Sequence, residues 1–284
     1  PVTLRMLLNH TSSLRDDAGY YWDAAKNVHL RDVLTASGKL HGSGAMWNSK
    51  HAPGTYFQYC NLAWGVIGSV MERATGDRFD RLMQRLVLDP LRLRGGFHPV
   101  DFDAQDLRNV ATLYRKRSTQ DGRDVWNPSG PWIAQVDDYV NERPLARAGA
   151  DYVPGSNGTL FGPQGNCRLS ADGLGRVMRM LIGRGRIDGV VFLREDSVAQ
   201  MLRQSWRLDA TVSNGQSDFG SQQALFHAWG LGNQHFLDVT GDNRGDRLAA
   251  SGGLRAVGHL GDAWGLTAAF VFDPATGNGL IYLI

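Results

Sequence analysis

A tyrosine and an asparagine one residue apart, in the run Tyr59-Cys60-Asn61, are the side chains of this sequence best suited to chemistry. A phenol can take and return a proton, and a carboxamide can hold a substrate amide in register. The run follows the turn Pro53-Gly54 and precedes an apolar helical pattern, Leu62 to Met71. A helix N-terminus offers unpaired N–H donors and a positive partial charge, so this position favours a tyrosinate. We therefore predict proton transfer by Tyr59 and substrate orientation by Asn61, although an asparagine here is more often a helix cap.

Four stretches of the chain resemble, in the same order, those of serine hydrolases with the penicillin-recognising fold: class C-type β-lactamases, D-alanyl-D-alanine carboxypeptidases and related esterases. Thr3–Leu14 is similar to the family's "LLTHTSGL", and the Tyr59–Asn61 run is similar to its Tyr-x-Asn motif. Leu169–Val198 resembles the family's late helix, glycine turn and following helix. Gly258–Leu266 stands where the family has "GHTGGTPGF". The resemblance runs from Thr3 to Ile284.

The resemblance implies a role for each motif residue. Tyr59 would be the general acid and base beside a serine nucleophile and its lysine, and Asn61 would orient the substrate amide. His259 stands where the family has Lys or His, and would polarise the site or meet a carboxylate. The backbone N–H of Asp262, after Gly261, would supply one oxyanion donor. Taken alone, a tyrosine at a helix start or a histidine in a strand is usually structural, so these roles depend on the shared order.

The family's nucleophile motif, a Ser followed three residues later by Lys, has no counterpart in this sequence. Its four lysines are Lys26, Lys39, Lys50 and Lys116, and the residues three positions before them are Asp23, Ala36, Trp47 and Leu113. We therefore expect the natural protein to extend further toward its N-terminus. The sequence as given is then a fragment that is inactive by itself.

The last motif also departs from the family, and these departures bear on the substrate. Leu260 replaces the usual Thr or Ser, which removes a hydroxyl that could bind a substrate carboxylate. Asp262 and Trp264 replace small residues, and a carboxylate near the oxyanion site disfavours anions. These changes favour hydrolysis of an ester or an amide over efficient β-lactamase activity. The alternative is a non-catalytic homologue that binds cell-wall peptide or a partner through the same cleft.

Composition excludes several other classes of protein. The 284 residues are 42% hydrophobic and 20% charged, which is typical of a globular domain with a large core. A net charge of +2, scattered along the chain, argues against nucleic acid as a partner. No run of 18 apolar residues occurs, and the eight histidines show no metal-binding spacing, so neither a membrane span nor a metal or other cofactor is expected. Cys60 and Cys167 make no disulfide framework, and Cys60 is interpreted as a packing residue. A periplasmic or secreted location is expected, with the cytoplasm as the alternative.

Helical patterns come first and strands last, which predicts an α+β fold with an antiparallel sheet covered by helices. A single domain, 1–284, would hold a mostly helical and loop region (1–165) and a region of helices and C-terminal sheet (166–284). Thr3, Asp77 and Ser170 are expected to cap helices, Gly76 to close the helix that begins at Asn61, and residues 274–278 to form the turn of a hairpin. Helices are expected at 4–9, 29–35, 61–74, 78–87, 170–182 and 194–203, and strands at 228–232, 248–251, 256–261, 266–273 and 279–284. The stretch 94–165 is expected to be a loop region walling a cleft, whose aromatic residues either line its entrance or pin the loop to the core. They are Trp126, Trp132, Tyr139, Tyr152 and Phe161.

Overall fold

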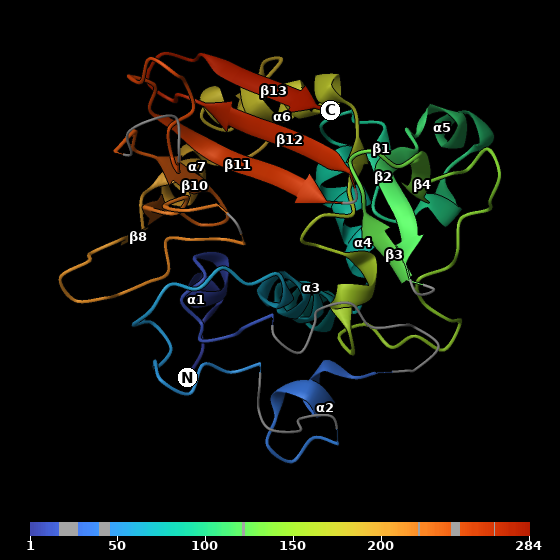
Figure 1. The fold of residues 1–284 in the computed structure, drawn as a ribbon, viewed down its shortest axis with the longest axis horizontal. Helices are drawn as coiled ribbons and strands as arrows, with labels where there is room; N and C mark the ends of the chain where they lie inside the picture. Colours follow the sequence, from blue (N-terminus) through green and yellow to red (C-terminus); the bar gives the residue numbers. More distant parts are fainter. Residues whose placement is uncertain (17–27, 40–45, 121–122, 221, 240–244, 264) are drawn as a thin grey trace.

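A six-stranded antiparallel sheet with the order β13-β12-β11-β10-β9-β8 organises the C-terminal part of the chain (Figure 1). The computed structural model describes residues 1–16, 28–39, 46–120, 123–220, 222–239, 245–263 and 265–284. The strands of this sheet are β8 (Trp206–Arg207), β9 (Ala228–Trp229), β10 (Gln234–Phe236), β11 (Ala256–Ala263), β12 (Leu266–Phe272) and β13 (Gly279–Leu283). The longer strands, β11 to β13, therefore lie at one side of the sheet.

The hairpin between β12 and β13 forms as its turn residues predicted. The Asp273 carboxylate accepts hydrogen bonds from the N–H of Ala275 and from the hydroxyl of Thr276, both at 2.8 Å. Gly277 has a φ of 75°, a conformation that costs glycine little. The strand expected at 248–251 was wrong. That segment forms bends and turns in the loop between β10 and β11.

Two helices lie beside the sheet, α6 (Ala171–Ile182) and α7 (Glu195–Leu202). Figure 1 shows α6 alongside β12 and β13, and Met178 of this helix packs against Val257 and Phe272 of the sheet. The Ser170 hydroxyl accepts a hydrogen bond from the N–H of Gly173 at 3.1 Å, so this residue caps α6 as predicted. The expected α+β arrangement, an antiparallel sheet covered by helices, is confirmed.

The N-terminal block is mostly helical. Its helices are α1 (Leu4–Leu8), α2 (Leu30–Leu34), α3 (Leu62–Thr75) and α4 (Phe79–Met83), which continues as the π-helical turn η2 (Gln84–Leu88). Thr3 caps α1 and Gly76 ends α3 with a φ of 74°, as predicted. The prediction that Asp77 caps α4 was wrong, because the cap residue is Arg78 and the N–H of Phe79 donates instead to Glu72 of α3 at 2.8 Å.

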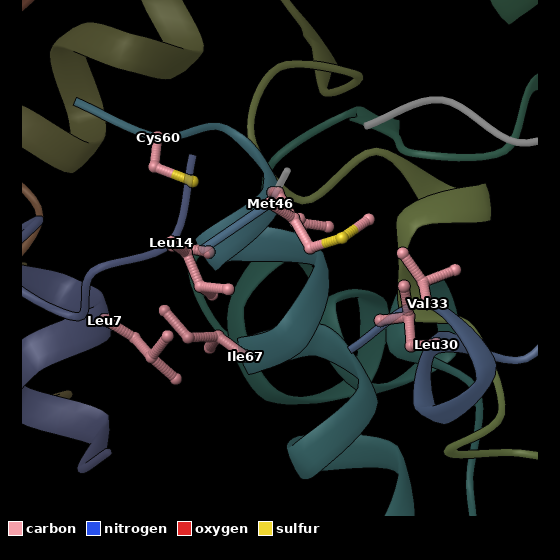
Figure 2. Close-up of a cluster of buried hydrophobic side chains, with 9 residues drawn as sticks. Leu7, Leu14, Leu30, Val33, Met46, Cys60 and Ile67 are labelled. Atoms are coloured by element: carbon pink, nitrogen blue, oxygen red, sulfur yellow. The ribbon is translucent and has the colours of Figure 1, made fainter. Parts of the chain in front are cut away.

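The core of this block gathers side chains from α1, α2, α3 and the segments between them. Figure 2 shows Leu7, Leu14, Leu30, Val33, Met46, Cys60 and Ile67. The Cys60 side chain is fully buried, and this burial raises the pKa of its thiol. Because a nucleophilic cysteine needs an accessible thiolate, Cys60 fits the packing role expected of it.

The stretch 94–165 contains strands where a loop was expected. A three-stranded sheet has the order β3-β2-β4, formed by β2 (Leu113–Gln120), β3 (Arg123–Trp126) and β4 (Trp132–Val136). The sequence prediction failed because no residue of β2 or β4 is fully buried and β2 is rich in charged residues, so no apolar alternation marks these strands. Arg115 lies over the ring of Trp126 at 5.4 Å, and Lys116 lies over that of Trp132 at 5.5 Å. Cation–π contacts therefore replace buried apolar pairs.

Two other aromatic residues of this stretch, Tyr152 and Phe161, pin it to the core. Tyr152 donates its hydroxyl hydrogen to Glu72 of α3 at 2.5 Å, and the N–H of Gly155 donates to the same carboxylate at 2.8 Å. Phe161 is fully buried against Phe79. The remaining short elements are β1 (Gly95–Gly96), η3 (Pro99–Asp101), α5 (Ala104–Asn109), η4 (Gly158–Phe161), β5 (Arg168–Leu169), β6 (Arg186–Ile187) and β7 (Val190–Val191). Among the described residues, no helix has the length and apolar character needed to cross a bilayer.

Candidate active site

The structure brings Tyr59 and His259 together from opposite ends of the chain. The Tyr59 hydroxyl oxygen lies 3.4 Å from Nε2 of His259 on β11. Nδ1 of the same imidazole contacts the carbonyl oxygen of Leu260, which can only accept, so Nδ1 carries the hydrogen. Burial lowers the pKa of His259 and favours the neutral ring. Nε2 therefore presents a lone pair, and the Tyr59 O–H donates to it.

Aromatic rings surround the Tyr59 phenol. Phe226 stacks on it with ring centroids 5.4 Å apart, and Phe219 meets it edge-on at 5.0 Å. Trp229, which is fully buried, packs edge-on against both Tyr59 (5.8 Å) and His259 (5.5 Å). These stiff side chains restrict the positions that the phenol and the imidazole can take relative to each other.

His10 holds the segment that carries Tyr59. Its carbonyl accepts a hydrogen bond from the N–H of Gln58 at 2.9 Å, and its ring Nδ1 accepts one from the N–H of Cys60 at 3.1 Å. The ring itself lies 4.5 Å from the Tyr59 ring. His10 has a left-handed φ of 58°, and burial, with a smaller contribution from His259, lowers its pKa to about 3. A neutral His10 thus fixes the backbone on both sides of Tyr59.

The Asn61 side chain is turned toward Asp16. One oxygen of that carboxylate accepts hydrogen bonds from the Asn61 backbone N–H (2.9 Å) and from its side-chain amide (2.8 Å). The other accepts from the N–H of Leu62 at 2.9 Å. Asp16 thereby caps α3, and the Asn61 side chain makes no capping bond. Within the described residues, Asn61 is not brought into hydrogen-bonding contact with Tyr59 or His259.

This arrangement corrects one expectation about Tyr59. The start of α3 was expected to offer unpaired N–H groups that stabilise a tyrosinate, but the N–H groups of Asn61 and Leu62 both donate to the Asp16 carboxylate. A negative charge at that point offsets the helix dipole. The local electrostatics therefore favour a neutral Tyr59 phenol that donates to His259.

Gly261 and Asp262 lie further along β11, where its pairing with β10 has ended. Asp262 stands opposite Thr267 of β12, while β10 pairs only with residues up to Gly258. The N–H and C=O of Thr267 both bond with Ile284, on the far side of β12 from β11. In an antiparallel pair of strands, when the backbone N–H and C=O of one residue point away from the partner strand, those of the residue opposite point away as well. The Asp262 N–H is therefore directed off the free edge of β11, on the side where β10 lies.

Sequence reasoning did not assign roles to His10 and Asp16. Both act through contacts with residues about 45 to 50 positions away, and neither stands in a local cap or turn pattern. His10 lies within the first of the stretches that resemble the serine hydrolases, which was the only available signal. No sequence signal marked Asp16, because the first N–H groups of a helix can be accepted by a carboxylate from anywhere in the fold.

A group of potential metal ligands lies elsewhere, at Asp80, His98 and Asp101. The guanidinium of Arg78 already lies 2.5 Å from an Asp80 oxygen and 3.7 Å from an Asp101 oxygen. His98 Nε2 accepts a hydrogen bond from the N–H of Arg147 at 3.1 Å, so its hydrogen is on Nδ1 and faces Asp101. This cluster is therefore an ion-pair network with its own cation.

Comparisons with known proteins extend over the whole chain. A family model described as Beta-lactamase matches residues 1–284. No curated protein sequence matches. Among solved structures, a penicillin binding protein from Bacillus halodurans is 17% identical with a TM-score of 0.58, over 99% of this chain and 68% of that one. A D-stereospecific amidohydrolase from Streptomyces sp. is 19% identical (TM-score 0.56, 99% and 66%), and a D-amino acid amidase from Ochrobactrum anthropi SV3 is 17% identical (0.55, 99% and 64%). The chain thus spans about two thirds of the length of these proteins, and at such identities the likeness concerns the fold.

Proposed function

The chain belongs to the beta-lactamase family, and from that premise we propose that it carries the proton-transfer and substrate side of an acyl-transfer site. The proposal rests above all on the 3.4 Å contact between the Tyr59 hydroxyl and His259 Nε2. The edge N–H of Asp262, on the same strand as His259, is the second support. The activity we propose for the whole protein is hydrolysis of an ester or an amide through an acyl-enzyme.

The proton transfers follow from the hydrogen-bond directions. As a serine oxygen attacks the substrate carbonyl, its proton passes to the Tyr59 oxygen while the Tyr59 proton moves to Nε2 of His259. The carbonyl oxygen becomes an oxyanion, which the Asp262 N–H would stabilise. The protons then return along the same path to the leaving group, which departs as an alcohol or an amine. Water repeats the sequence to release the acid.

These 284 residues do not contain the Ser-x-x-Lys motif that carries the family's nucleophile. No Ser, Thr or Cys stands three residues before a lysine. We therefore assign catalysis to the whole protein and make no serine of this sequence its nucleophile. Tyr59, Asn61 and His259 would surround the serine–lysine pair, with Asn61 orienting the substrate amide from its anchor on Asp16.

The substrate we propose is a neutral ester or amide. Leu260 packs in the apolar clusters around Phe57 and Phe236 and has no hydroxyl to offer a carboxylate. The Asp262 side chain is exposed near the edge N–H and repels anions. Penicillins and cephalosporins carry a carboxylate next to the reacting ring, so both features disfavour them. The amidase and amidohydrolase named among the structural relatives share the fold of this chain.

Paired rate measurements on the whole protein test this proposal. A p-nitrophenyl ester of a short acid and an amino acid amide should be hydrolysed with a higher kcat/KM than a chromogenic cephalosporin. An Asp262→Asn variant should reduce the difference in kcat/KM between the neutral substrates and the cephalosporin. This substitution removes the charge that repels anions and keeps the backbone N–H. Faster hydrolysis of the cephalosporin by the unaltered protein would overturn the substrate assignment.

A second candidate is a non-catalytic homologue that binds cell-wall peptide or a partner through the same cleft, which absence of a Ser-x-x-Lys motif from the whole protein would favour. A fluorophosphonate probe, which labels activated serines, distinguishes the hydrolase from the non-catalytic homologue. Labelling of one serine in the whole protein supports the hydrolase. Saturable binding of a cell-wall peptide without labelling or turnover supports the homologue.

A further inference from the structure

A half-exposed phenylalanine lies against the tyrosine of the candidate active site. The Phe219 ring meets the Tyr59 ring edge-on with centroids 5.0 Å apart, and 44% of Phe219 is exposed. The other described rings in contact with Tyr59 are either buried or only partly exposed, and they belong to His10, Phe226, Trp229 and His259. Among the described rings around Tyr59, Phe219 therefore offers the most surface to another molecule.

The loop that joins β8 to β9 carries Phe219, and backbone hydrogen bonds tie this loop to the Tyr59 segment. The N–H of Phe57 donates to the carbonyl of Asn214 at 2.9 Å. The carbonyl of Phe57 in turn accepts from the N–H of Gln216, also at 2.9 Å. Because Phe57 stands two residues before Tyr59, these bonds fix the position of the loop relative to the phenol.

Further backbone hydrogen bonds hold Phe219 within a closed turn. The N–H of Phe219 donates to the carbonyl of Gln222 at 2.9 Å, and the N–H of Gln222 donates back to the carbonyl of Phe219 at 3.0 Å. The N–H of Phe226, whose ring stacks on Tyr59, donates to the carbonyl of Ser217 at 2.8 Å. An apolar surface that is already held in place costs little ordering entropy when a ligand covers it.

The position of Phe219 determines which part of a substrate it can meet. Its ring contacts the phenol whose oxygen lies 3.4 Å from His259 Nε2. A substrate whose leaving group takes a proton from that oxygen brings the groups beside its scissile bond close to Phe219. The phenylalanine side chain has no hydrogen-bonding atom, so it favours apolar groups, whose burial removes surface from water. An aromatic group gains further from an edge-to-face or offset contact.

We propose that Phe219 determines substrate specificity by contacting an aromatic or bulky apolar group attached beside the scissile carbonyl. The inference rests on the proposed function, because it takes Tyr59 to act on the substrate of an acyl transfer. The substrate class is then an ester or amide that carries an aromatic ring, on its acyl side or on its leaving-group side. The ring is the shared chemistry, and the choice of esters in the test separates the two sides.

Hydrolysis of three small esters by the whole protein tests the proposal. Methyl acetate has no ring, methyl phenylacetate has one on the acyl side, and benzyl acetate has one on the leaving-group side. Phe219→Ala should lower kcat/KM for at least one aromatic ester at least about threefold, the usual worth of an aromatic pair, and leave that for methyl acetate within about twofold. Phe219→Leu keeps an apolar side chain and should lie between the unaltered protein and Phe219→Ala.

Val212→Ala is the matched control, because Val212 is an apolar residue of the same loop and is 67% exposed. It should leave kcat/KM for all three esters within about twofold, since surface substitutions away from a site have small effects. Equal losses on all three esters in Phe219→Ala, or the same selective loss in Val212→Ala, would overturn the proposal. Circular dichroism confirms that each variant is folded.

A binding measurement keeps this inference distinct from the proposed function. Benzylacetone has a ring and a carbonyl but no leaving group, so its binding does not require hydrolysis. Ligand-observed NMR with the whole protein should show binding that Phe219→Ala weakens at least about threefold and that Val212→Ala leaves unchanged. Failure to hydrolyse any of the esters would overturn the proposed function alone. Binding of benzylacetone that is insensitive to Phe219→Ala would overturn the role of Phe219 alone.

Discussion

The Tyr59 hydroxyl donates to His259 Nε2 across 3.4 Å, and the far nitrogen of that imidazole is held by the carbonyl of Leu260. Because the tautomer is fixed by this second contact, His259 can receive a proton from Tyr59 without first losing one. The imidazolium would then keep its Nδ1 hydrogen on Leu260. The pair can thus take up and return a single proton with little movement of either side chain.

Tyr59→Phe in the whole protein should lower the acylation rate by about 10²–10⁴-fold, the usual contribution of general acid–base catalysis. The ring and its aromatic neighbours are unchanged, so the free energy of unfolding should change little. Single-turnover kinetics with a p-nitrophenyl ester and urea denaturation measure the two effects. Tyr56→Phe is the control, because the Tyr56 ring stacks on that of His51 and is not part of the Tyr59–His259 pair. An ester rate unchanged by Tyr59→Phe removes Tyr59 from the mechanism.

His10→Ala should destabilise the protein by about 1–3 kcal/mol through the Cys60 N–H alone, because that buried donor loses its acceptor. His10→Asn should recover part of this loss. Asparagine tolerates a positive φ and has a side-chain oxygen, although that oxygen reaches less far than Nδ1. Urea denaturation of both variants measures the difference. If His10→Asn is no more stable than His10→Ala, the acceptor is not what His10 contributes.

Asp16→Asn should destabilise the protein by about 1–3 kcal/mol, because an amide cannot accept all the N–H groups that the carboxylate accepts at the start of α3. The Asn61 side chain also loses its charged anchor. In the whole protein, KM for an amide substrate should therefore rise more than KM for an ester. Asp151→Asn is a control at an exposed aspartate. Equal KM changes for amide and ester would argue against a role of Asn61 in holding an amide.

Stability should fall in mild acid, and buried His10 is one cause. Its pKa is lowered from 6.5 to about 3 in the folded protein, so the unfolded chain binds more protons between these values. The free energy of unfolding should then decrease by up to about 1.4 kcal/mol per pH unit as the pH falls from 6.5 toward 3. Burial also lowers the pKa of His259, which adds to the loss in the same direction. Urea denaturation at several pH values measures this dependence. The free energy of unfolding should fall less steeply with decreasing pH in His10→Asn than in the control variant His51→Asn.

Residues 1–284 alone should not react with a fluorescent penicillin or a fluorophosphonate, because no serine among them is paired with a lysine in the family's spacing. Mass spectrometry of the intact chain after incubation measures this directly. Stoichiometric labelling of any serine would show that another base activates it. The mechanism would then have to be rebuilt around that residue.

The sequence was sufficient where short patterns carry the information. Ser170, Gly76 and the turn at Asp273 behave as their local chemistry predicts. The order of motifs also singled out Tyr59 and His259, whose side chains lie 3.4 Å apart and whose catalytic roles are a proposal. The sequence was insufficient where the backbone N–H at a helix start donates to a side chain outside the local cap pattern. Phe79 obtains its acceptor from Glu72 rather than from a neighbouring cap, which no helix-start rule anticipates. Strands β2 and β4, in which no residue is fully buried, were missed for another reason, since their sequences lack the apolar alternation that marks a half-buried strand.

The Glu72 carboxylate has a consequence for the order in which the chain can fold during synthesis. Its partners Tyr152 and Gly155 stand 80 and 83 residues later, so the ribosome needs about 4–16 seconds to supply them after α3 has been made. Until then the carboxylate that belongs in the core lacks two of its donors and favours a hydrated position. The contacts that tie Tyr152 and Gly155 to α3 are therefore completed only late in translation, after the core that α3 shares with α1 and α2 has been synthesised.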